Sequence, residues 1–151
     1  GGYGNIDELK KIIEGHNSFI YHGIVPNNIV RQSMSKSDLL ILPSKYDGYG
    51  AVVNEGLQCG CQILVSNKCG SEFLIRKHPQ FGYVFDVNSS NDFINKLKTI
   101  LNKGTMTIKQ KEYIYHWSQL HISPDIIANY LYDYIDYYFD SKKNRPIQPW
   151  E

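Results

Sequence analysis

Short apolar runs alternate with helical patterns along this chain, and that alternation restricts its fold more than any other feature. Four runs are typical of strands, at residues 18–22, 39–42, 63–66 and 82–85. The run Leu39–Leu42 is apolar throughout, as expected for the centre of a parallel sheet. Alternating strands and helices predict an α/β protein with a doubly wound, Rossmann-like parallel sheet and right-handed crossovers. On such sheets, ligands bind at the carboxyl ends of the strands.

Helical patterns fill the intervals between these strands. They cover residues 6–14, 26–35, 51–58, 71–77, 91–101, 107–119 and 124–139. Pro26 and Pro124 suit first helical turns, because proline lacks the backbone N–H that a first turn leaves unpaired. We therefore expect one domain at residues 1–140, C-terminal helices included, followed by an exposed tail at residues 141–151.

Composition excludes several classes of function. A formal net charge of +1 over 151 residues offers no basic stripe for a phosphate backbone, so no nucleic-acid partner is expected. No run is long enough to span a bilayer, and no signal peptide is visible. Cys59, Cys61 and Cys69 lack the second ligand pair of a metal site, so we interpret them as ordinary thiols in a reducing compartment.

The segment from Pro43 to Gly60 carries the chemistry. The strand at 39–42 runs into a loop with Asp47, then Gly48-Tyr49-Gly50, then a helix that carries Glu55. A glycine loop before a helix N-terminus offers free N–H groups and a positive dipole end to an anion. Two carboxylates beside such a site suit a ligand with both hydroxyls and phosphates, such as a nucleotide-sugar. Gly56 costs about 1 kcal/mol inside a helix, a cost that close packing against the sheet would explain.

This segment resembles the signature of the retaining GT-B glycosyltransferases, in particular family 4. There, Pro-Ser-x-x-Glu-Gly-Phe-Gly is followed by a second Glu after seven residues; here Asp47 and Glu55 are also separated by seven residues. Further matches are Gly23-Ile24-Val25, the strand at 60–66, Gly70-Ser71-Glu72 and the C-terminal helices. The resemblance covers nearly the whole chain and implies the C-terminal, donor-binding half of a GT-B enzyme.

The resemblance also assigns roles to individual residues. Glu55 would bind the ribose hydroxyls of the donor. Asp47 would be the catalytic carboxylate that contacts the hydroxyls of the donor sugar and stabilises a cationic transition state, although an Asp in place of the family's Glu reaches about 1.5 Å less far. The remaining donor-binding positions present mainly backbone groups to the sugar, diphosphate and base: Gly48, Tyr49, Gly50, Ala51, Gly23 and Ile24.

The implied function is retaining transfer of a sugar from a nucleoside diphosphate donor to a hydroxyl acceptor, in polysaccharide or glycolipid synthesis. The resemblance implies no metal and no cofactor besides the nucleotide-sugar substrate. The saccharide or lipid-linked acceptor would bind through an N-terminal domain. The resemblance further implies a cytoplasmic protein, with peripheral association at the inner membrane face left open.

Gly1-Gly2-Tyr3-Gly4 resembles the turn after the second strand of this domain. We therefore expect a chain without the domain's first two strands, which alone would bind donor weakly and be inactive. Two alternatives remain open. One is a catalytically degenerate nucleotide-sugar-binding module, and the other is a nucleotide-sugar epimerase of the same fold.

Overall fold

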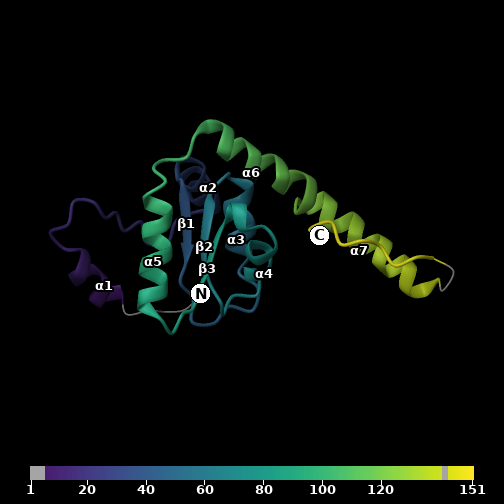
Figure 1. Ribbon diagram of the computed structural model, residues 1–151, viewed down its shortest axis with the longest axis horizontal. Coiled ribbons are helices and arrows are strands. Elements are labelled where there is room, and N and C mark those ends of the chain that lie inside the picture. The colour runs from purple at the N-terminus through teal and green to yellow at the C-terminus, as the bar shows by residue number, and fades with distance from the viewer. Residues whose placement is uncertain (1–5, 141–142) are drawn as a thin grey trace.

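A three-stranded parallel sheet forms the centre of the protein (Figure 1). The computed structural model describes residues 6–140 and 143–151, and the predicted Gly1–Gly4 turn lies outside them. The strands are β1 (Leu39–Leu42), β2 (Gln62–Ser66) and β3 (Gly82–Phe85), in the order β1-β2-β3. In this register, Leu40 pairs with Ile63, and Ile63 pairs with Gly82. The predicted α/β class with a parallel sheet and flanking helices is confirmed.

Helices cover both faces of this sheet (Figure 1). The helix α5 packs against β3 on one face, whereas α3 and α4 pack on the other. The described helices are α1 (Ile6–Ile13), α2 (Asn27–Lys36), α3 (Ala51–Gln58), α4 (Glu72–Lys77), α5 (Ser90–Leu101), α6 (Ile108–His121) and α7 (Pro124–Phe139), with a 3₁₀ turn at Pro79–Phe81. Local sequence sets several of these starts: Ser89 caps α5 by accepting from the Asp92 N–H, and Thr107 and Gln110 form a capping box on α6.

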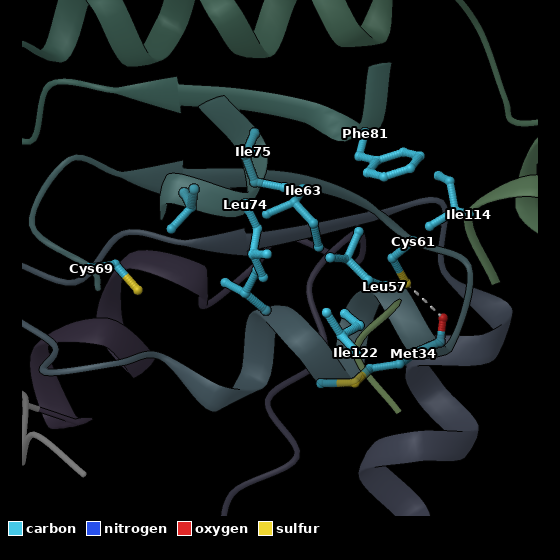
Figure 2. Close-up of a cluster of buried hydrophobic side chains, with 12 residues drawn as sticks. Met34, Leu57, Cys61, Ile63, Cys69, Leu74, Ile75, Phe81, Ile114 and Ile122 are labelled. Atoms are coloured by element: carbon cyan, nitrogen blue, oxygen red, sulfur yellow. Dashed lines mark hydrogen bonds between the residues drawn. The ribbon is translucent and has the colours of Figure 1, made fainter. Parts of the chain in front are cut away.

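The core is divided by the central strand β2. Ile63 and Val65 join a large cluster with residues of α3, α4 and α6, whereas Leu64 faces a smaller cluster under α5. Successive side chains of a strand point to opposite faces, so this alternation buries β2 on both sides. Figure 2 shows the labelled side chains of the large cluster converging, Leu57 and Ile75 among them.

Gly56 allows α3 to lie close to this sheet. A Cβ at this position would come within 2.7 Å of Leu40 Cδ2 and 3.0 Å of Ile63 Cδ1. Those distances are too short for real carbon contacts, so a larger residue would push the helix away from the sheet. The close packing expected for this glycine is confirmed.

The predicted strand at 18–22 is wrong. Residues 16–23 form an exposed, irregular segment, in which 61% of Phe19 and 77% of Ile20 is accessible to solvent. A strand requires a hydrogen-bonded neighbour, and the described sheet does not include this segment as a fourth strand. The segment has strand propensity but pairs with no strand of the described sheet, so it is irregular.

The C-terminal part leaves the body of the protein and then returns. Helix α6 packs against α3, α7 extends away from the sheet, and the last residues run back along α7 (Figure 1). No residue of α7 is buried. The expectation of an exposed tail holds for residues 143–145 but is wrong for residues 148–150, which are half-buried.

Trp150 anchors this returning segment. Its ring lies 5.3 Å from that of Tyr130 and 6.2 Å from that of Phe73, centroid to centroid. Its carbonyl oxygen lies 3.1 Å from His78 Nε2. The segment therefore contacts both α4 and α7. Within residues 6–140 and 143–151, no helix is long and apolar enough to cross a membrane.

Candidate functional site

The loop between β1 and α3 ends in a backbone conformation that requires glycine. Gly50 is the residue before α3, with φ 80° and ψ 54°, in the left-handed region. It is buried, and a Cβ there would lie 2.1 Å from Cys69 Sγ. Gly50 has no side chain with which to cap α3, and its carbonyl accepts from the Val53 N–H over 2.9 Å.

A second loop, at residues 67–71 after β2, is hydrogen-bonded to the first. The Asp47 N–H donates to the Lys68 carbonyl over 3.0 Å, and the Gly70 N–H donates to the Asp47 carbonyl over 3.1 Å. The Ser71 N–H donates to the Tyr49 carbonyl over 2.6 Å. Because the loops follow neighbouring parallel strands, they meet at the carboxyl edge of the sheet, where α/β proteins bind ligands.

The two loops border an open surface cavity of about 320 Å³. It is lined by Tyr46, Asp47, Gly48, Asn67, Lys68, Cys69, Gly70 and Glu72. Gly70 fits closely, since a Cβ there would lie 2.3 Å from the Gly48 carbonyl oxygen. The cavity lining thus contains the carboxylates of Asp47 and Glu72 and the ammonium group of Lys68. Beside them, the backbones of the two loops pack closely against each other.

Asp47 is half-buried in this cavity, with its carboxylate held by its own loop. The Oδ1 atom accepts from the Tyr49 N–H over 3.2 Å, which fixes the side chain against the backbone two residues on. Gly48 and Tyr49 are exposed beside it, and Ala51 opens α3. Of the predicted residues from Asp47 to Ala51, Asp47 and Gly48 line the cavity.

Glu55 lies elsewhere on α3 and does not line this cavity. It is half-buried, one turn before Cys59 on the same helix. Burial raises the pKa of Cys59, the Arg31 guanidinium on α2 lowers it, and the negative charge of Glu55 adds to the rise. Glu55 is thus on the side of α3 near α2, separate from Asp47.

Gly23 and Ile24 are not joined to either acid. Both lie in the exposed segment before α2, where Gly23 has φ 65° and the Ile24 side chain is fully accessible. In the described chain, no backbone hydrogen bond connects this segment to α3 or to the loop at Asp47. Their predicted role stays a prediction.

Lys68 is the cationic member of the lining residues that the sequence prediction of the site did not include. It is exposed at the mouth of the cavity, and its carbonyl accepts from the Asp47 N–H. Its only sequence signal was a lysine shortly after the strand at 63–66. Among the residues that the structure describes, no group of three or more His, Cys, Asp or Glu side chains could hold a metal ion.

Comparison with known proteins shows similarity to glycosyltransferases. Residues 2–117 match the family described as Glycosyl transferases group 1. Over 84 residues the chain is 27% identical to the UDP-Gal:alpha-D-GlcNAc-diphosphoundecaprenol alpha-1,3-galactosyltransferase of Escherichia coli, a match covering 56% of this chain and 21% of that protein. Over 98 residues it is 22% identical to the Sulfoquinovosyl transferase SQD2 of Arabidopsis thaliana, covering 64% of this chain and 19% of that protein.

The matched part thus spans about a fifth of the length of these curated relatives. The family match itself, in contrast, covers most of this chain. It includes both loops of the cavity and the whole sheet. This protein belongs to the group 1 glycosyltransferase family.

Proposed function

We propose that this chain forms the donor-binding part of a retaining GT-B glycosyltransferase. The observation that carries the proposal is the cavity between the Asp47 and Gly70 loops, at the carboxyl edge of a parallel sheet. Family membership supports a nucleotide-sugar as the ligand. The whole enzyme would transfer a sugar from a nucleoside diphosphate to a hydroxyl group.

In this proposal, the protein stabilises charge on the leaving diphosphate. Gly48 and Lys68 line the cavity, and we propose that the Gly48 N–H and the Lys68 ammonium group offset the developing negative charge, aided by the dipole of α3. Asp47 contacts the hydroxyls of the donor sugar, and Glu55 accepts hydrogen bonds from the ribose. No metal or further cofactor takes part in the proposed transfer.

The acceptor is proposed to be a saccharide or a lipid-linked sugar. The name of the Escherichia coli relative specifies a sugar diphosphate on undecaprenol as its acceptor. A similar acceptor would place the protein at the cytoplasmic face of a membrane, in polysaccharide or glycolipid synthesis. If Glu55 binds the ribose as proposed, Gly23 and Ile24 would lie near the donor base, on the α2 side of Glu55.

Calorimetric titration of the full-length protein with UDP, GDP and their sugars tests this proposal. Glu55→Gln keeps the size of the side chain but removes its charge. Hydrogen bonds to a charged group contribute about 1.5–3 kcal/mol, so the dissociation constant should rise about 10- to 100-fold. Absence of binding by the unmodified protein would refute the proposed function.

Asp47→Asn separates catalysis from binding. We expect turnover to fall while affinity for the nucleoside diphosphate stays within about threefold, because Asp47 is proposed to contact the sugar and not the nucleotide. Unchanged turnover would refute the catalytic role and favour a degenerate binding module. Donor consumption without any acceptor would instead favour an epimerase.

A further inference from the structure

Hydrogen bonds fix both the backbone and the side chain of Tyr49. Its backbone is fixed by the Ser71 N–H, which donates to its carbonyl, and by its own N–H, which donates to Asp47 Oδ1. Its ring is fixed by Asn54, whose Nδ2 donates to the Tyr49 hydroxyl over 2.9 Å. Asn54 is on α3, next to Glu55 and five residues after Tyr49.

Asparagine at position 54 lowers the stability of the folded state in two ways. It lies within the eight-residue helix α3, where asparagine has a lower helix propensity than leucine. Its Oδ1 is buried and has no hydrogen-bond partner among the described residues. A buried acceptor without a partner destabilises the folded state, whereas an apolar residue of similar size would avoid that penalty. Residues that break local rules in this way are concentrated at functional sites.

The Tyr49 ring needs such a contact to be fixed. It is 48% exposed, so packing alone leaves one side of it free. A loop that is already ordered loses less conformational entropy when it binds a ligand. The bond from Asn54 therefore orders the ring, the Tyr49 backbone and, through the Tyr49 N–H, the carboxylate of Asp47.

We propose that Asn54 is a positioning residue for the donor site, acting through the Tyr49 hydroxyl on the loop from Asp47 to Gly50. This inference rests on the proposed function, because it assigns the ordered loop to nucleoside diphosphate binding. Neither Asn54 nor the Tyr49 hydroxyl contacts the ligand in this proposal. Both act by holding the loop in its binding conformation before the ligand arrives.

The experiment uses two substitutions that delete the bond from either side. Tyr49→Phe removes only the hydroxyl, and Asn54→Leu removes the amide while keeping a side chain of similar length. Each is prepared in the full-length protein, alone and together, with Tyr138→Phe on α7 as a matched control whose ring is 74% exposed. Calorimetry measures the dissociation constant of UDP or GDP, whichever the unmodified protein binds more tightly, and thermal unfolding measures Tm.

Each single substitution should raise the dissociation constant about three- to tenfold, the range expected for one neutral hydrogen bond. The double substitution should raise it no further, because both changes delete the same bond. Tm should fall by a few degrees in Tyr49→Phe, because Asn54 Nδ2 loses its partner, and should be unchanged or higher in Asn54→Leu, since the latter removes the unpaired Oδ1. Weaker binding by Asn54→Leu without lower stability is what a purely structural role would not produce.

Other results overturn the inference. If the two increases in the dissociation constant multiply in the double variant, Asn54 and Tyr49 act independently. A lower Tm in Asn54→Leu that accompanies the loss of affinity would show a structural role. Unchanged affinity in both single variants would overturn this inference alone, whereas an unmodified protein that binds neither nucleotide would overturn the proposed function as well.

Discussion

Replacing Gly50 by alanine is the most direct test of how the loop before α3 is built. Two features of this position oppose any side chain. Its φ of 80° lies in the left-handed region, and a Cβ would approach Cys69 Sγ to 2.1 Å, Ser71 Oγ to 3.0 Å and Leu42 Cδ2 to 3.2 Å. The surrounding loop would have to shift before an alanine could be accommodated.

The expected cost follows from these two features. The left-handed conformation costs a residue with a Cβ about 1–2 kcal/mol. Overpacking a tightly filled site costs about 1–3 kcal/mol more. Alanine recovers about 0.4–1 kcal/mol by restricting the unfolded chain. The free energy of unfolding should therefore fall by about 3 kcal/mol, and Tm by about 6–12 °C for a chain of this length.

Thermal unfolding followed by circular dichroism measures this change, and Gly104→Ala is the matched control. Gly104 has φ +78°, and no atom lies within 4 Å of the position that a Cβ would take, so an alanine there meets the backbone strain without the steric clash. Its Tm should fall by about 2–4 °C, as expected for roughly 1 kcal/mol. Cys69→Ala should relieve part of the cost in the Gly50→Ala background, because it removes the nearest atom.

Two results would refute this reasoning. Equal destabilisation by Gly50→Ala and Gly104→Ala would show that the contact with Cys69 contributes nothing. An unchanged Tm in Gly50→Ala would show that the loop does not require the left-handed conformation.

Two other regions give separate predictions. Trp150→Ala should lower the free energy of unfolding by about 2 kcal/mol, roughly half the cost for a fully buried tryptophan, whereas Ile147→Ala, at a side chain 81% exposed, should change it by less than about 0.5 kcal/mol. Equal effects in denaturant unfolding would show that the C-terminal segment is not anchored. Burial raises the pKa of Cys61 from 9.0 to about 11, so its thiol ionises in the unfolded state first, and stability should fall as pH rises from 9.0 to about 11. Comparing the unfolding free energies of the unmodified protein and Cys61→Ala across that range checks this, and parallel pH profiles would contradict it.

Local patterns in the sequence were enough to predict most of the helices and strands. The bounds of β1, β3, α3 and α7 agree with the residues expected for them, and the other described helices differ by one or two residues at their ends. Each of these elements carries its own signals, such as a continuous apolar run or a proline in the first helical turn. Such signals act between residues close in sequence, so they can be read without knowledge of the fold.

The errors occurred where structure depends on contacts between distant residues. Phe19 and Ile20 have strand propensity, but a strand forms only with a hydrogen-bonded neighbour. Trp150 is in a polar, proline-containing segment that resembles a tail, yet it packs against Phe73 and Tyr130. Neither outcome could be read from the residues on either side.

The candidate site was predicted in the same partial way. The sequence alone determined that a loop with Asp47 and two glycines joins a strand to a helix, because that pattern is local. Only the tertiary structure decided that the loop at Gly70 pairs with it, that Lys68 joins the cavity, and that Glu55 lies outside it. The reason is physical: parallel strands bring together the loops at their carboxyl ends although helix α3 separates them in sequence, and the rotation of a helix fixes which of its side chains reach the same space.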